Sequence, residues 1–232
     1  MADIPVSRVA WRPSYRLVAS RFPPVSVFDR VADPADLEAV YEIEAMTNPR
    51  VRQDAGNLNL VPPRERVTGL GSTPIMAAFT HLNPDGSRFS DGSFGVYYCA
   101  REEETAIRES IYHTARFLAY SDEPPIDVEK RLYCTELRAN LHDIRSGHHV
   151  KPGWYDPHSY AASQPLGITL RHAGSSGIVY RSVRHPPGQC AAVFRPRSLI
   201  PPARQTKHFG LRWDGTRITH VYEMRSSGVR LP

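Results

Sequence analysis

The chain has 232 residues, of which 41% are hydrophobic and 23% charged, a composition that suits one domain with a modest core. Its formal net charge of +5 favours an anionic ligand or partner: a nucleic acid, a dinucleotide or an acidic protein. No stretch approaches the roughly 20 apolar residues of a membrane helix, and the N-terminal residues lack the apolar segment of a signal peptide. We therefore expect a cytoplasmic protein with no membrane partner.

Cysteine and histidine usage points away from a metal or disulfide framework. Cys99, Cys134 and Cys190 are odd in number, far apart and outside any CxxC motif. The three histidines between residues 142 and 149 lack a carboxylate or cysteine at usual ligand spacing. No metal site is predicted.

The N-terminal part of the chain predicts one strand and one helix. Residues 1–13 read as a loose arm, and residues 14–21 (SYRLVASR) alternate as a strand does. Asp33 can cap a helix and Pro34 fits its first turn, while Asn48-Pro49 should end it.

The next segment has little periodicity. Residues 50–75 contain Pro62-Pro63, and we expect them to form a long surface loop with at most one short strand. Residues 74–80 (PIMAAFT) form a short buried element whose type the sequence leaves open.

Gly86 to His113 is the most informative stretch (GSRFSDGSFGVYYCAREEETAIRESIYH). It begins as a Gly-rich turn, continues as an apolar strand over Gly95–Ala100, and ends in a helix predicted from about Glu103 to Tyr120.

The apolar positions of this helix recur at helical spacing and should face the core: Ile107, Ile111, Ala115 and Leu118. Glu109 lies about 200° around the helix from Ile107 and shares its face with His113 and Arg116. From the pattern alone, this face could be a solvated one carrying a Glu–His pair at i,i+4.

The remaining elements are predicted from alternation and turn chemistry. They are a strand over Glu129–Ala139, a helical segment over 156–173 broken at Pro165 and capped by Gly174, strands Gly177–Tyr180 and Gln189–Arg195 paired through HPPG, and a hairpin from His208 to Glu223. The hairpin should turn at Asp214-Gly215.

Three blocks in this order resemble the RES domain family: GSRFSDGSFGVYYCA, then TAIRESIYH, then GIVYRSVRHPPGQCAAVFRP at 177–196. The resemblance spans about Tyr15 to Pro196. It implies an α+β fold with an ADP-ribosyltransferase-like split β-sheet core flanked by helices. The implied organisation is a single domain over 1–232, with an arm at 1–13, a core at 14–196 containing the 50–75 insertion, and a C-terminal extension at 197–232 that carries the hairpin.

The resemblance also implies an activity. RES proteins supply toxins of RES–Xre toxin–antitoxin pairs and consume NAD+, cleaving the nicotinamide–ribose bond. ADP-ribose then passes to a protein (mono-ADP-ribosylation), to water or to phosphate. The implied partners are an Xre-type antitoxin that neutralises growth inhibition and a protein acceptor of ADP-ribose.

Five residues match positions to which the family assigns function. By resemblance, Glu109 in TAxxE stabilises the ribosyl cation or binds a ribose hydroxyl, and Arg88 binds the pyrophosphate or ribose. Tyr98 would stack on or orient the nicotinamide; the adjacent Tyr97, on the opposite face of the strand, is the alternative. Arg16 of the leading YRL and Ser182 would hydrogen-bond NAD+. Short family members carry GGRW where this chain has Gly86-Ser87-Arg88-Phe89, which leaves the acceptor open.

Two other functional hypotheses remain. The chain could be an RNA-binding or RNA-cleaving toxin, because RSVRHPPG and HFGLRW combine arginine with histidine or aromatic residues. The basic residues are scattered and no RNA-binding motif occurs, so we expect no direct nucleic-acid binding. A non-catalytic partner protein would instead leave Arg88, Tyr98 and Glu109 apart.

Overall fold

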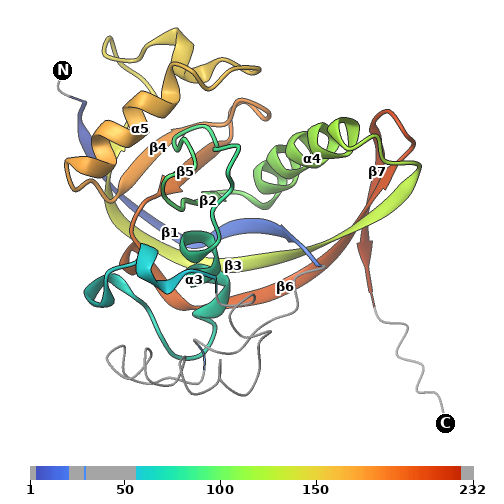
Figure 1. The fold of residues 1–232 in the computed structure, drawn as a ribbon, viewed down its shortest axis with the longest axis horizontal. Helices are drawn as coiled ribbons and strands as arrows, with labels where there is room; N and C mark the ends of the chain where they lie inside the picture. The colour runs from blue at the N-terminus through green and yellow to red at the C-terminus, as the bar shows by residue number, and fades with distance from the viewer. Residues whose placement is uncertain (1–3, 21–28, 30–55, 226–232) are drawn as a thin grey trace.

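A computed structural model describes residues 4–20, 29 and 56–225 (Figure 1). The helix predicted to begin at Asp33 lies outside the described residues. The described elements are strands β1 (Val6–Ala19), β2 (Tyr97–Ala100), β3 (Ile126–Asp143), β4 (Gly177–Arg181), β5 (Gln189–Val193), β6 (Leu199–Trp213) and β7 (Ile218–Met224), and helices α3 (Thr73–Thr80), α4 (Glu103–Tyr120) and α5 (Ser163–His172).

The strands form one seven-stranded sheet in the order β1-β2-β5-β4-β3-β6-β7. Strand β1 pairs with both β2 and β3, so the short strands β2, β5 and β4 are joined at each end to the long strands. Helices α4 and α5 lie on one side of this arrangement and α3 on the other (Figure 1). The predicted mixed α+β fold is confirmed.

Two hydrophobic clusters occupy the two faces of the short strands. Tyr97 of β2 belongs to the cluster that contains Leu137 of β3 and Met76 of α3. Ala100 of β2 belongs to the other cluster, with Ala106 of α4. Because side chains alternate along a strand, neighbouring residues of β2 contact different helices, and this alternation decides which residues can share a site.

Several predicted elements are confirmed. The helix predicted from about Glu103 to Tyr120 has those bounds in α4. The strands joined by HPPG are the antiparallel pair β4 and β5. The C-terminal hairpin is formed by β6 and β7, which extend the sheet, although its loop comprises residues 214–217 and not the two-residue turn at Asp214-Gly215.

The prediction of a loose arm over residues 1–13 is wrong from Val6 onward. Strand β1 begins there and pairs with β3, and Val9 and Trp11 are buried. A register irregularity between Trp11 and Ser14 interrupts the alternation at Arg12-Pro13 and hides the first half of the strand from sequence patterns.

The segment before α3 is also more buried than predicted. Leu58 and Val61 belong to the core, and the described part of the predicted surface loop forms two 3₁₀ turns and no strand. The element of open type at 74–80 is α3.

Helix α5 begins at Ser163, so the helix predicted over 156–173 is shorter than expected. Pro165 lies in the first turn and does not break the helix, because the first turn has no intrahelical partner for its N–H groups. Among the described residues, no helix is both long and apolar enough to cross a bilayer.

Candidate functional site

The Glu109 carboxylate is held against the turn that connects β4 and β5. Its Oε1 accepts hydrogen bonds from Ser182 Oγ at 2.6 Å and from the Val183 backbone N–H at 3.2 Å, and the Cys190 thiol lies 4.0 Å away. Its Oε2 accepts no hydrogen bond from any described residue. Glu109 is half-buried, so it does not lie on a fully solvated helix face.

Ser182 is buried, with 4% of its surface exposed, and its hydroxyl makes three hydrogen bonds. While it donates to Glu109, it accepts from the backbone N–H groups of Arg184 at 3.2 Å and His185 at 2.9 Å. One side chain therefore shapes the turn and orients the carboxylate.

The turn packs directly on the start of α4. A Cβ atom on Gly188 would lie 2.3 Å from Thr105 Oγ1, so only glycine allows this approach. The Thr105 hydroxyl is also hydrogen-bonded to His185 Nδ1 at 3.0 Å. These contacts fix the distance between Ser182 and α4.

Tyr98 organises the Gly-rich loop before β2. Its hydroxyl bonds to Ser87 Oγ at 2.8 Å and accepts from the Phe89 N–H at 3.0 Å. Burial raises the pKa of Tyr98 to about 12, so the phenol is neutral. Tyr180, a residue that the sequence reasoning missed, is 5% exposed and packs edge-on against Phe89.

Arg88 lies in the same loop but is directed into the protein. It is 7% exposed, and its Nη1 donates to the carbonyl oxygens of Trp154 at 2.9 Å and Asp156 at 3.0 Å. Its guanidinium carbon lies 4.9 Å from the centre of the Tyr160 ring. Arg88 thus ties its own loop to residues 154–160.

Helix α5 holds the Arg88 loop from the other side. A Cβ atom on Gly167 would lie 1.9 Å from the Phe89 carbonyl oxygen, so the helix and loop backbones are in contact. Gln164 Nε2 donates to the carbonyl oxygens of Ser87 and Ser90, each at 3.2 Å.

The structure does not bring Arg16 to this group. Its guanidinium carbon lies 4.6 Å from the centre of the Tyr97 ring, and its Nη1 donates to the Tyr98 carbonyl oxygen at 3.0 Å. The reason is strand register. Tyr15 is opposite Ala100 and shares its face, so the next residue, Arg16, lies on the opposite face with Tyr97.

Further functional candidates lie along α4 and in the turn. Tyr112, His113 and Arg116 follow Glu109 at i+3, i+4 and i+7, and therefore share its side of the helix. The Arg184 guanidinium carbon lies 3.3 Å from the centre of the Tyr112 ring. The helical spacing of the α4 residues was visible in the sequence, whereas the stacking of Arg184 was not.

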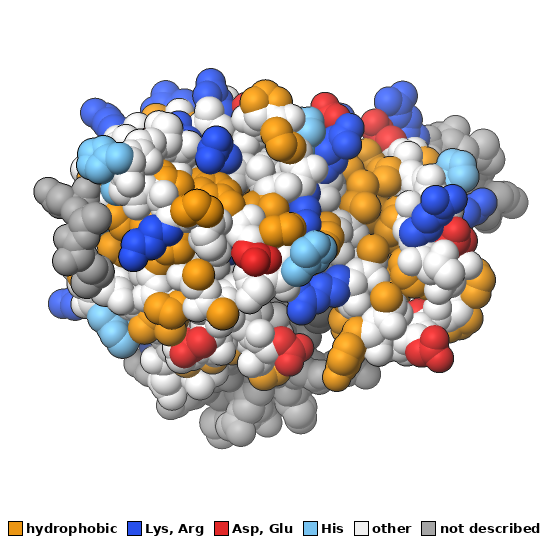
Figure 2. All heavy atoms as spheres, turned by 90° about the horizontal axis from the view of Figure 1, so that it is seen from above, with side chains coloured by type: hydrophobic (Ala, Val, Ile, Leu, Met, Phe, Trp, Pro, Cys, Tyr) orange, Lys and Arg blue, Asp and Glu red, His pale blue; other side chains and the backbone are white. Residues whose placement is uncertain are grey.

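His113 marks the centre of this group. His113 is exposed at the surface, but desolvation by its neighbours lowers its pKa; the charge of Glu109 opposes this effect, and those of Arg184, Arg88 and Arg116 add to it. One carboxylate and three guanidinium groups therefore act on a single imidazole. Figure 2 shows the molecule from above α4 and α5, where basic side chains are spread among apolar ones over this face.

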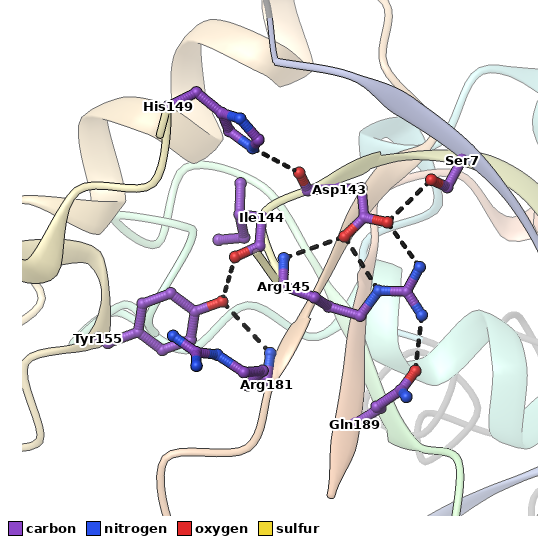
Figure 3. A network of polar contacts seen from close by, with 8 residues as sticks. All are labelled: Ser7, Asp143, Ile144, Arg145, His149, Tyr155, Arg181 and Gln189. Carbon is purple, nitrogen blue, oxygen red and sulfur yellow. Dashed lines mark hydrogen bonds and ion pairs between the residues drawn. The ribbon is translucent and has the colours of Figure 1, made fainter. Parts of the chain in front are cut away.

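A second polar network lies at the end of β3 (Figure 3). Asp143 accepts from Ser7 Oγ at 2.8 Å and from Arg145 Nε at 3.0 Å, and Arg145 Nη1 donates to Gln189 at 2.7 Å. The Tyr155 hydroxyl accepts from the Arg181 N–H at 3.3 Å, beside Ser182. The network joins the starts of β1 and β5 to the ends of β3 and β4.

No three His, Cys, Asp or Glu side chains gather as metal ligands within the described part of the chain. The predicted site residues thus divide into a directly bonded pair, Glu109 and Ser182, two loop anchors, Arg88 and Tyr98, and the separate Arg16.

Comparisons with known proteins identify the family of the chain. The family model described as RES domain matches residues 64–214, which include α4, the β4–β5 turn and strand β6 but not Arg16. Uncharacterized protein y4oC from Sinorhizobium fredii (strain NBRC 101917 / NGR234) is 32% identical over 214 residues, covering 92% of this chain and 88% of that protein.

A solved structure, the M. tuberculosis MbcT–MbcA toxin–antitoxin complex, contains a chain that aligns with a TM-score of 0.43 and 8% identity. The alignment covers 94% of this chain and 86% of that chain. This likeness is loose, and the family assignment rests on the sequence matches.

Proposed function

Because this chain belongs to the RES domain family, we propose that it consumes NAD+ by breaking the bond between ribose C1′ and the nicotinamide nitrogen. The reaction passes through a sugar cation that resembles an oxocarbenium ion. An enzyme for this step needs a fixed negative charge beside C1′ more than it needs an acid, because nicotinamide leaves as a neutral molecule.

The observation that carries the proposal is the asymmetric environment of the Glu109 carboxylate. Ser182 and the Val183 N–H hold Oε1, whereas Oε2 is left for a ligand. A carboxylate fixed in this way is already oriented when positive charge develops on the sugar, and preorganised charge of this kind is an effective form of catalysis. Oε2 can also accept a hydrogen bond from a ribose hydroxyl.

The bond changes balance without a further reactant beyond the acceptor. The electron pair of the C1′–N bond goes to nicotinamide, which becomes neutral. An oxygen or nitrogen of the acceptor forms the new bond to C1′, and its proton goes to solvent. With water, the products are ADP-ribose, nicotinamide and one proton; with a protein side chain, the product is a mono-ADP-ribosylated protein.

The other predicted residues take different roles in this proposal. Tyr98 and Arg88 hold the loops at 86–90 and 154–160 in place around the substrate. Ser182 orients Glu109. Arg16 packs in the other core cluster and is not included among the NAD+ contacts.

We further propose that the chain is the toxin of a toxin–antitoxin pair and that an Xre-type antitoxin neutralises it. Loss of cellular NAD+ or ADP-ribosylation of an essential protein would both arrest growth. A neighbouring antitoxin reading frame should restore growth when it is co-expressed.

The test is to incubate purified protein with NAD+ labelled in the adenine ring and to separate the products, with and without phosphate or cell lysate. Release of nicotinamide by the wild type, with label on ADP-ribose, on its 1-phosphate or on a protein, supports the proposal and identifies the acceptor. Intact NAD+ with prompt fragmentation of cellular RNA after induction would contradict it and favour the RNA-cleaving alternative.

A further inference from the structure

Three arginines approach the Glu109 region, but they differ in how their N–H groups are used. The charges of Arg88, Arg116 and Arg184 all act on His113, which is itself one helical turn from Glu109. Since guanidinium groups repel one another, gathering three of them near one imidazole favours the binding of an anionic ligand there.

Arg88 is not available to such a ligand through Nη1. That nitrogen donates to two carbonyl oxygens, and the residue is 7% exposed. Arg88 therefore resembles a structural cation that connects two loops.

Arg184 is held in a different way. Its guanidinium carbon lies over the Tyr112 ring, 3.3 Å from the ring centre, and its Nη2 donates to the Pro157 carbonyl oxygen. Within the described structure, neither Nε nor Nη1 of Arg184 has a hydrogen-bond acceptor. A stacked guanidinium with free N–H groups is preorganised to bind a phosphate oxygen pair, because little side-chain entropy remains to be lost.

Arg116 is exposed and stands beside the same loop. Its guanidinium carbon lies 6.0 Å from the centre of the Tyr160 ring, on the α4 face that carries Glu109. The Asp156 carboxylate of this loop accepts from the N–H groups of His158 at 2.7 Å and Ser159 at 2.8 Å, and it forms no ion pair with Arg116 or Arg184 in the described structure.

We propose that Arg184, assisted by Arg116, binds the diphosphate of the dinucleotide, and that Arg88 is a positioning residue for the loops around it. The inference rests on the proposed function, because it names the anionic half of the same substrate. It places Glu109 at the ribose and the two arginines at the diphosphate, where their positive charges meet its two negative charges.

The test uses ligands that carry or lack the diphosphate. We expect R184Q to weaken binding of ADP-ribose, measured by calorimetry, by about 10- to 100-fold, the effect of losing one or two charge-assisted hydrogen bonds. R116Q should have a smaller effect. For nicotinamide riboside, which has no phosphate, kcat/KM should change by less than about twofold in R184Q, since the lost interaction is absent there.

Arg181 offers a matched control. It also stacks on a tyrosine, with its guanidinium carbon 5.2 Å from the centre of the Tyr155 ring, but it belongs to the network at the end of β3 (Figure 3). R181Q should leave ADP-ribose affinity unchanged. R184K keeps the charge but not the planar guanidinium group, so it should restore only part of the lost affinity for ADP-ribose.

The outcomes separate the two proposals. If the wild type releases nicotinamide but R184Q and R116Q bind ADP-ribose as tightly as R181Q does, the diphosphate assignment is wrong and the proposed activity stands. Equal losses of kcat/KM for NAD+ and for nicotinamide riboside in R184Q would also overturn the assignment. A wild type that neither binds ADP-ribose nor releases nicotinamide overturns both.

Discussion

Ser182 Oγ lies 2.6 Å from Glu109 Oε1, and the two residues are 73 positions apart in the chain. The bond joins the end of β4 to the middle of α4 and fixes one carboxylate oxygen while the other has no partner among the described residues.

Replacing Glu109 should remove the activity and leave the fold intact. In E109Q, nicotinamide release should fall by about 100- to 1,000-fold, the usual loss when a preorganised group that stabilises transition-state charge is removed. The amide can still accept from Ser182, so the thermal unfolding midpoint should change little. Turnover of NAD+ at the wild-type rate by E109Q or by E109A would show that another group bears the developing charge.

Ser182 should act through Glu109, and its loss should mainly lower kcat. S182A removes the donor to Oε1 and the acceptor of the Arg184 and His185 N–H groups, so the carboxylate loses its fixed orientation. We expect kcat to fall about tenfold or more, with a smaller change in the affinity for ADP-ribose. S121A, which removes a hydroxyl bonded only to carbonyl oxygens at the end of α4, serves as the control. The same kcat in both variants would disprove the positioning role.

The adjacent tyrosines of β2 should behave differently, because their side chains lie on opposite faces. Y98F leaves the Phe89 N–H without its acceptor, and an unsatisfied buried donor costs about 1–3 kcal/mol. Since this N–H belongs to the loop of Arg88, activity should fall as well.

Y97F removes a bond to Thr135 at 3.3 Å in the other core cluster and should affect stability alone. The free energy of unfolding in urea and the rate of nicotinamide release should be compared between the two variants. Equal activity losses in Y97F and Y98F would contradict the assignment of the two faces.

Asp143 should make folding stability depend on pH below about 4. Burial alone would raise the pKa of Asp143, but hydrogen bonds from the Arg145 side chain and backbone and from Ser7 lower it to about 2. Because the pKa is lower in the folded chain than in the unfolded chain, where it is about 3.9, the ionised carboxylate stabilises the fold above that value. This contribution, roughly 2 kcal/mol, is lost as the pH falls from about 4 to about 2.

The measurement compares urea unfolding of the wild type and D143N at pH 7 and near pH 2.5. The difference in unfolding free energy should be large at pH 7 and should shrink at the lower pH. D127N is the control, since Asp127 pairs with Arg212 on the surface, where ion pairs contribute little. A difference between wild type and D143N that is independent of pH would exclude the carboxylate as its source.

Local sequence patterns were sufficient for the elements that carry the site. The helical spacing of apolar residues predicted α4 with its observed bounds, and HPPG predicted the pairing of β4 with β5. The shared face of Glu109, His113 and Arg116 also follows from helical periodicity. Two of the three blocks that resemble the RES domain family cover the part of α4 that holds Glu109 and the strand pair whose turn holds Ser182, and the first block covers the Arg88 loop and β2.

The predictions of secondary structure failed where the local sequence pattern was interrupted. The irregularity at Arg12-Pro13 concealed the start of β1, and Pro165 was read as a helix break although it stands in a first turn. In both cases proline occupies a position where its missing N–H is not required, and only the pairing of the surrounding backbone reveals this.

The sequence by itself determined the family, the main helix and strands, and the side of α4 on which Glu109 lies, because these depend on residues close together along the chain. Only the tertiary structure decided that Arg16 packs against Tyr97, that Arg88 is bonded to loop carbonyl groups, and that Arg184 stacks on Tyr112. Those contacts depend on strand register and on loop packing between segments 66 to 82 residues apart. A shift of one residue in register moves a side chain to the opposite face, and no local periodicity specifies it.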